Sequence, residues 1–326
     1  MPSGITHILL KKELHDYPLS DPLDEVLAAG MDFLQIGAVA PDLPYASVAD
    51  DDFFLTTQSD LADNFHYVKT NEVPLTMLQL LKDRQAALAP RELDFSFCFV
   101  SGYIAHVVAD GIVHPYIRDK VGNYSDHKTE HRKLEMQLDI LYMHRLSEKT
   151  GYSLELSCSN LEDELKNFNR KTYPEIDKAI EIFQNAIHSV YNKTYQSDTI
   201  LGWVEGLHRM FKVATSHIPI IYKIGVDSAF FFDIFDHVDK YKDLLVLSKP
   251  VDAQPLNFLK KESIRYFDDV LPQFFKKYLP LAEKAYDFIY EGGSALTPED
   301  IMPIDLDTGR PLASHNNLDI VPSFWS

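Results

Sequence analysis

Ionisable side chains recur at four-residue spacing in two stretches of this sequence. The first series is His106, Asp110 and His114, and the second is His127, His131, Glu135 and Asp139. A step of four residues returns to nearly the same side of an α-helix, so each series forms one row. Imidazole and carboxylate groups are typical ligands of zinc and related divalent ions. The spacing therefore predicts a metal centre carried by two consecutive helices.

The two series differ in their surroundings. Apolar residues surround the first one, and three ionisable groups in a buried helix are costly unless a metal or another partner satisfies them. The small residues Ser101, Gly102 and Ala105 precede it and would let another helix or a ligand approach closely. Basic residues interrupt the second series, so it also fits a solvated helix face with salt bridges.

Three further residues upstream have side chains that bind metals. His7 lies in GITHILL, Asp42 lies between two prolines in GAVAPDLPY, and His66 lies in NFHYV after a polar stretch. Each is weak evidence alone. A carboxylate in an apolar, proline-bounded loop is a reasonable metal ligand, although Asp42 also fits as a helix cap.

The segments GITHILL, GAVAPDLPY, FHY, GYIAHVVADGIVHP and HRKLEMQLD, in this order, resemble the zinc-dependent phospholipase C family. That family is related to the fungal zinc-dependent single-strand nucleases, which have the same fold. The resemblance covers about residues 1–140 and implies an all-α, multi-helix bundle. By position it implies one zinc on Asp42, His66, His106 and Asp110, a second ion bridged by Asp110 and bound by His7, and a further zinc on His114, His131 and Glu135.

The resemblance implies a metal-dependent hydrolase of phosphate esters, similar to a phosphodiesterase or phospholipase C, that uses metal-activated water. Asp42 could also act as a base toward that water. Two features differ from the secreted members. In those members the free amino-terminal residue is a zinc ligand. Here His7 lies six residues from Met1, and no signal peptide is visible. We therefore expect two or three zinc ions, and occupancy of the site linked to His7 is left open. The interval from Asp110 to His114 is also shorter, which makes His127 an alternative ligand.

The composition limits the classes of substrate and the cellular compartment that we expect for this protein. The 326 residues carry a net charge of −18, which opposes binding to nucleic acid or anionic membranes. No apolar run reaches the length of a membrane span, and Cys98 and Cys158 form no disulfide framework, so we expect a cytoplasmic protein. A small phosphate ester or a phospholipid remains as substrate, and a lipid would need an apolar groove. The alternative is a non-catalytic, metal-stabilised binding or scaffold protein.

Helical periodicity dominates the chain, and few windows alternate with a period of two. We predict helices near residues 5–15, 21–29, 74–89, 92–118 and 127–148, with 46–73 as a loop. Further helices are predicted near 159–169, 174–192, 198–222, 227–246 and 257–291, followed by an irregular tail from about 292. Residues 1–150 are expected to form the metal-binding helical core. Residues 151–326 form a helical region of unknown role, which could belong to the same domain.

Overall fold

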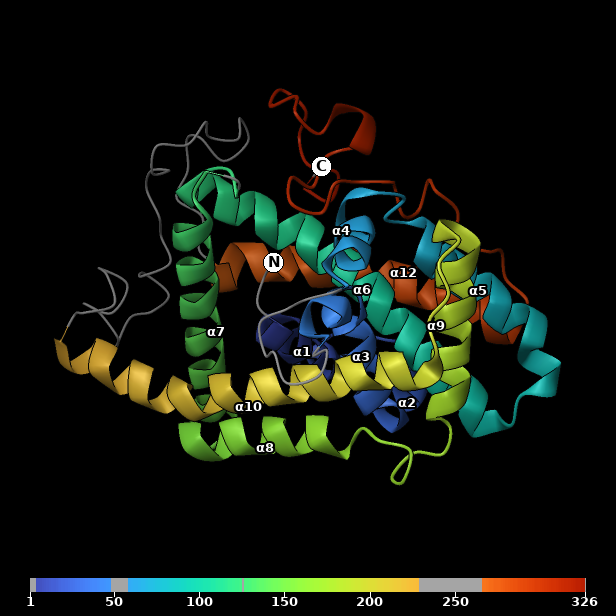
Figure 1. The fold of residues 1–326 in the computed structure, drawn as a ribbon, viewed down its shortest axis with the longest axis horizontal. Helices are drawn as coiled ribbons and strands as arrows, with labels where there is room; N and C mark the ends of the chain where they lie inside the picture. The colour runs from blue at the N-terminus through green and yellow to red at the C-terminus, as the bar shows by residue number, and fades with distance from the viewer. Residues whose placement is uncertain (1–3, 48–57, 125, 229–265, 326) are drawn as a thin grey trace.

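Helices make up most of the regular structure of the computed structural model, which describes residues 4–47, 58–124, 126–228 and 266–325 (Figure 1). The amino-terminal half contains α1 (Gly4–Lys12), α2 (Asp21–Ala29), α3 (Met31–Val39), α4 (Ser59–Tyr67), α5 (Glu72–Arg84), α6 (Pro90–Val121) and α7 (Lys128–Thr150). The other half contains α8 (Leu154–Asn167), α9 (Ile176–Tyr191), α10 (Ser197–Ser228) and α12 (Leu271–Tyr286). Short 3-10 turns include η2 (Ala40–Ala46), and π-helical turns flank α12. Within the described residues the β-type pairing is one isolated bridge between Ile304 and Pro311, so the all-α prediction is confirmed.

The long helix α6 is the central element, and it is buried on all sides along most of its length. Its composition explains this position, because a helix that is apolar all round needs covering by other elements on every face. Pro90 occupies its first position, where a missing N–H costs nothing, and Gly122 ends it with a φ of 95°. The predicted start at residue 92 was therefore two residues late.

Helices α3 and α6 cross in direct backbone contact. A Cβ atom added to Gly102 would lie 2.2 Å from the carbonyl oxygen of Leu34, and one added to Gly37 would lie 2.0 Å from that of Phe99. Only residues without a side chain permit this approach. The close approach that the small residues predicted is thus confirmed, and its partner is α3. It places η2, which directly follows α3, beside the metal-ligand row of α6.

Most predicted elements are present, with two corrections. Residues 46–73 were predicted as loop, but α4 occupies Ser59–Tyr67. Its mean hydropathy is near neutral and its apolar face is only Leu61, Ala62 and Phe65, so the polar residues hid the pattern. The proline-bounded stretch around Asp42 was expected to be a loop, but it forms the 3-10 turn η2, which directly follows α3. Residues 229–246 of the predicted helix 227–246, and residues 257–265 of the predicted helix 257–291, lie outside the described residues.

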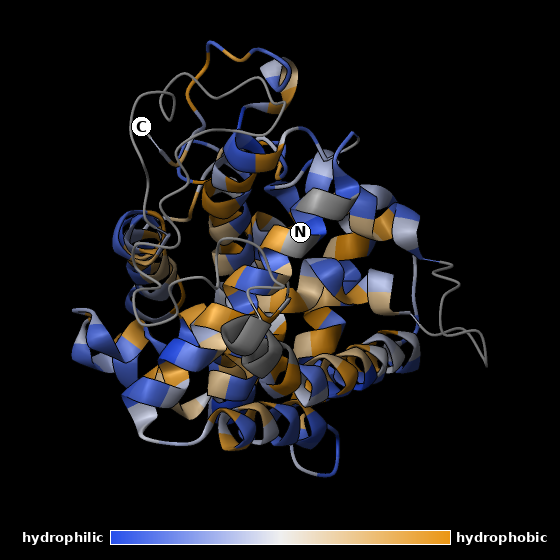
Figure 2. Cartoon of the chain, turned by 90° about the vertical axis from the view of Figure 1, so that its left-hand side faces the viewer, coloured by the Kyte–Doolittle hydropathy of each residue, from blue (hydrophilic) through white to orange (hydrophobic). Residues whose placement is uncertain are grey.

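One continuous hydrophobic core joins both halves of the chain, from Ile5 to Phe324. Hydrophilic and hydrophobic residues alternate along the outer helices (Figure 2), as expected when one face of each is polar. Residues 292–325 are largely irregular, as predicted, yet Ile301, Ile304 and Leu306 are buried. The tail is therefore packed against the helices.

One long helix bears on the prediction that no apolar run reaches the length of a membrane span. On length and composition alone, α6 could cross a membrane, and α2 with the segment after its 78° bend would pass the same test as a pair. The prediction counted uninterrupted apolar residues, and the polar ligand row interrupts α6. The 18-residue apolar window of α6 is entirely buried inside the fold.

Candidate metal centre

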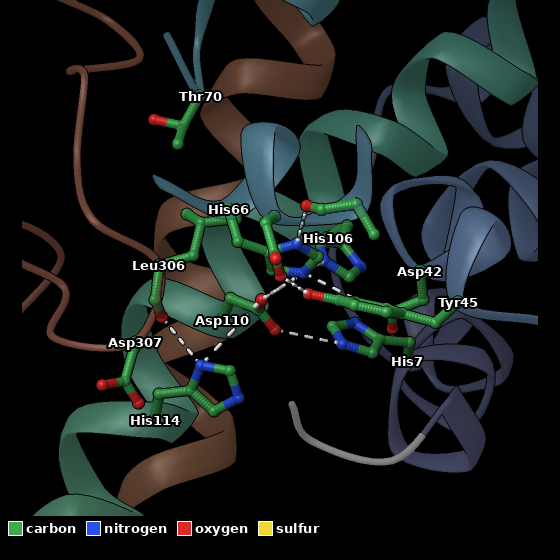
Figure 3. A network of polar contacts seen from close by, with 12 residues as sticks. His7, Asp42, Tyr45, His66, Thr70, His106, Asp110, His114, Leu306 and Asp307 are labelled. Atoms are coloured by element: carbon green, nitrogen blue, oxygen red, sulfur yellow. Dashed lines mark hydrogen bonds and ion pairs between the residues drawn. The ribbon is translucent and has the colours of Figure 1, made fainter. Parts of the chain in front are cut away.

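Five separate elements, α6 among them, bring the predicted metal ligands together. Figure 3 shows those of α1, η2, α4 and α6. The ligands are His7 on α1, Asp42 on η2, His66 on α4, His106, Asp110 and His114 on α6, and His131 and Glu135 on α7. All eight side chains are buried, with exposed fractions between 0% and 7%. They form three groups whose donor atoms lie within 4.8 Å of one another.

The first group joins Asp42, His66 and His106. The Nε2 atom of His66 lies 3.2 Å from Asp42 Oδ1 and 3.3 Å from His106 Nε2. The Nδ1 atoms of the two rings contact backbone carbonyls, that of Ala62 at 2.7 Å for His66 and that of Ala38 at 2.8 Å for His106. A carbonyl oxygen can only accept, so each Nδ1 carries the proton. The lone pair of each Nε2 atom therefore faces a carboxylate, that of Asp42 for His66 and that of Asp110 for His106, as metal ligation requires.

The second group shares His106 with the first and adds His7 and Asp110. Asp110 Oδ1 lies 3.1 Å from His7 Nε2, whereas its Oδ2 lies 3.2 Å from His106 Nε2 and 3.6 Å from His66 Nε2. The rings of His7 and His106 stack with centroids 4.2 Å apart. The two carboxylate oxygens of Asp110 thus face different groups, which is the arrangement of a bridging ligand.

The third group combines the two helical rows. Glu135 Oε1 lies 3.1 Å from His131 Nε2 and 3.7 Å from His114 Nε2. His114 joins this group despite its short interval from Asp110, whereas the alternative His127 packs against Gly122 at the end of α6. The second row therefore faces the interior at His131 and Glu135, and the alternative of a solvated helix face is wrong at these two positions.

Buried atoms without hydrogen bonds indicate how well this site fits a metal. Within the described part of the chain they include both ring nitrogens of His7, Asp42 Oδ1, both oxygens of Asp110, and Nε2 of His114. Such atoms are costly in a protein interior unless something binds them. Ligands on one tetrahedral zinc ion lie about 3.4 Å apart at the usual bond lengths. The observed separations of 3.1 to 3.7 Å match this value.

The charges in the site support one another. Burial disfavours the charged form of Asp110, but its interactions with the rings of His106 and His114 outweigh this effect, so the pKa of this carboxyl lies well below its usual range. The same balance, with His106 and His66, lowers the pKa of Asp42. Burial lowers the pKa of His7 to about 4, which leaves its ring neutral near pH 7. Ionised carboxylates and neutral imidazoles are the forms that bind metal ions.

A cavity of about 530 Å³ borders the metal-ligand groups. Asp42 and Glu135 line it, as do Tyr45 of η2 and Arg132 of α7. Most of its wall is apolar and comes from α7 and α10: Met136, Ile140, Leu207, Met210, Phe211, Val213, Ala214 and Ile218. The ligand groups are thus buried but border a space that could admit a substrate.

Several residues support the site in ways that the sequence did not predict. The backbone carbonyl of Leu306 accepts a hydrogen bond from His114 Nδ1 at 2.7 Å, and no local pattern in the sequence signals such a contact. Asp139 continues the second row, but it accepts hydrogen bonds from the backbone and hydroxyl of Thr6 and so anchors α1. The hydroxyl of Tyr45 donates to Asp63 at 2.6 Å on the rim of the cavity.

Comparison with known proteins adds one finding. A family model described as zinc-dependent phospholipase C matches residues 6–183, more than half of the 326 residues. Searches of curated proteins and of solved structures found no match. The matched range begins one residue before His7 and ends in α9, so it includes all eight predicted ligands.

Proposed function

Because this chain belongs to the zinc-dependent phospholipase C family, we propose that it hydrolyses phosphodiesters that carry an apolar group. The observation that carries the proposal is the position of the buried ligand groups beside an apolar cavity. A structural metal site would need only the ligands. A catalytic one needs an open side as well, which the cavity lined by Asp42 and Glu135 offers.

The eight buried residues would hold two or three zinc ions in the groups described above. Bound zinc lowers the pKa of water, so that hydroxide is available near neutral pH, and stabilises negative charge on the phosphate oxygens. Asp42 lies at the boundary between the ligand groups and the cavity, where its carboxylate could accept a proton from the attacking water. The neighbouring His106 and His66 keep that carboxylate ionised, because they lower its pKa.

The cavity wall supports an apolar substituent next to the phosphate. Leu207, Phe211 and Ile140 are buried residues of this wall and would pack against an acyl chain or an aryl ring. Among the described residues that line the cavity, Arg132, which follows His131 on α7, is the one Lys or Arg, and it could pair with a phosphate oxygen. This apolar lining favours a phospholipid or aryl phosphodiester over nucleic acid, for which stacking platforms in a basic groove are typical.

The test is turnover by the metal-loaded full chain of two substrates, bis(p-nitrophenyl) phosphate and a short-chain phosphatidylcholine. We expect both to be hydrolysed, and we expect a chelator to abolish the activity and added zinc to restore it. Metal-loaded protein that hydrolyses neither substrate would favour the non-catalytic, metal-stabilised alternative.

A pair of variants on α10 tests the role of the apolar wall. Val213 lines the cavity and is 52% exposed, whereas Ile220 is 57% exposed on the same helix but outside the cavity. Val213→Asp should raise the KM for the phosphatidylcholine by about tenfold, because burying the lipid beside a charge costs more than 1 kcal/mol. Ile220→Asp should leave that KM unchanged. Equal effects of the two variants would exclude this cavity as the lipid site.

A further inference from the structure

The carboxyl-terminal segment reaches back to the metal-ligand histidines. Residues 304–311, called the C-terminal turn here, lie outside the range matched by the family model. Within this turn the backbone carbonyl of Leu306 accepts from His114 Nδ1 at 2.7 Å, and the backbone N–H of Leu306 donates to the carbonyl of His66 at 3.0 Å (Figure 3). One residue of the turn therefore contacts ligand residues of two different groups.

The contact with His114 determines which ring nitrogen can bind an ion. A carbonyl oxygen has no proton to give, so Nδ1 of His114 must be the donor. Its Nε2 then holds the lone pair, and this atom is buried, lacks a hydrogen-bond partner and lies 3.7 Å from Glu135 Oε1. A metal-ligating histidine whose second nitrogen is held in this way is fixed in both tautomer and ring orientation.

Internal hydrogen bonds hold the turn in shape. The carboxylate of Asp305 accepts from the backbone N–H groups of Asp307 at 3.0 Å and Thr308 at 2.8 Å. The Asp307 N–H belongs to the same peptide group as the Leu306 carbonyl. The backbone N–H of Asp305 donates to the carbonyl of Arg310 at 2.8 Å. Gly309, with a φ of 65°, closes the turn in a conformation that favours glycine. The direction of the Leu306 carbonyl therefore depends on Asp305.

The turn also packs directly on the helix that carries the ligands. A Cβ atom added to Gly309 would lie 2.7 Å from the carbonyl oxygen of Gly111, which follows Asp110. Pro115, one turn later, has no N–H, so it cannot donate the usual helical hydrogen bond to the Gly111 carbonyl. This carbonyl is therefore left without that helical donor where the turn packs. Beyond the turn, the indole N–H of Trp325 donates to the carbonyl of Ile112 at 3.0 Å. The contact thus lies on α6 between two predicted ligands, Asp110 and His114.

We propose that the C-terminal turn is a positioning element of the metal centre, which holds His114 in the orientation that binds an ion together with His131 and Glu135. The inference rests on the proposed metal-dependent function. Supporting hydrogen bonds of this kind contribute about 10–100-fold to metal affinity. Coupling between two sites is reciprocal, so an ion in this group must in turn stabilise the turn.

Hydrogen exchange in the unmodified chain tests this reciprocity. The zinc-loaded protein is compared with the same protein after treatment with a chelator. We expect faster exchange in peptides that cover 304–311 after zinc removal, and unchanged exchange around Asp300, whose carboxylate accepts from the backbone of Thr297 at 2.7 Å. Equal protection of the turn with and without zinc would overturn the proposal. A chain that binds no zinc would refute the proposed function itself.

Two matched variants measure the effect on affinity. Asp305→Ala removes the carboxylate of the turn, and Asp300→Ala removes a similar one that accepts from a backbone N–H away from the metal centre. In a zinc titration, the binding step that is lost in His131→Ala is the one that belongs to the third group. We expect Asp305→Ala to weaken that step by about 10–100-fold and Asp300→Ala to leave it unchanged. Wild-type affinity in a folded Asp305→Ala protein would contradict a positioning role, and the exchange experiment decides the question if this variant does not fold.

Discussion

The crossing of α3 and α6 offers a sharp test of how the fold builds the metal centre. In Gly102→Ala the new methyl group would lie 2.2 Å from the carbonyl oxygen of Leu34 and 2.7 Å from the backbone nitrogen of Ala38. Carbon and oxygen atoms normally approach to about 3.3 Å, so the helices must separate by roughly 1 Å. Both obstacles belong to the backbone and cannot rotate away as the end of a side chain could.

The expected cost follows from two opposing effects. Overpacking of this kind costs about 1–3 kcal/mol, and the rigid obstacles favour the upper end. The gain in helix propensity from Gly to Ala offsets about 1 kcal/mol of this cost. We therefore expect the free energy of unfolding of the metal-free protein to fall by about 2 kcal/mol. The separation also stretches the 2.8 Å hydrogen bond from His106 Nδ1 to the carbonyl of Ala38, so zinc affinity should fall by about 10–100-fold.

Gly202 provides the matched control. It lies inside α10, and a Cβ atom added to it would meet nothing within 4 Å. Gly202→Ala should therefore stabilise the protein by up to about 1 kcal/mol and leave zinc binding unchanged. Denaturant unfolding of the metal-free proteins and competition with a chromophoric chelator measure the two quantities. If Gly102→Ala unfolds like the wild type and keeps its zinc affinity, the close crossing does not position His106.

Two further predictions concern the ligands themselves. The His131→Ala protein should bind one ion fewer than the wild type and keep the ions of the groups around His106, because His131 contributes only to the third group. Elemental analysis after dialysis checks this number. Loss of all metal would show that the groups do not bind ions independently. The pKa of His7 falls from 6.5 unfolded to about 4 folded because of burial, so the unfolded chain takes up the proton first. Stability of the metal-free protein should therefore fall as the pH drops from 6.5 to 4, by about 3 kcal/mol from this residue. His7→Asn should remove that part of the pH dependence in urea unfolding, and an unchanged slope would exclude His7 as its source.

Local sequence patterns predicted the helices of this fold well because their apolar faces are long and periodic. The predictions were wrong where the periodic signal was short, as in α4, whose apolar face consists of three residues. The row of ligands on α6 was predictable from its four-residue spacing and its apolar neighbours. Those neighbours made burial, and therefore metal binding, the physically favoured interpretation.

The assembly of the site could not be derived from spacing alone. Asp42 and His66 lie on other elements, and their approach to His106 depends on the glycine contact between α3 and α6 and on the packing of α4. The resemblance to a known family supplied their expected roles as ligands, and the short distances between these side chains in the structure are consistent with those roles. The Leu306 carbonyl was beyond prediction, because a backbone group leaves no mark in the sequence and lies 192 residues from its partner His114.

The most direct test of the metal centre is the metal content of the purified full chain, measured by inductively coupled plasma mass spectrometry together with that of Asp110→Ala. Asp110 is fully buried, and its two oxygens lie at 3.1 and 3.2 Å from His7 and His106. The wild type should contain two or three zinc ions per chain, and the variant should lose the ions of the two groups that Asp110 joins. A folded, metal-free wild type, or a variant that keeps its full metal content, would contradict the account.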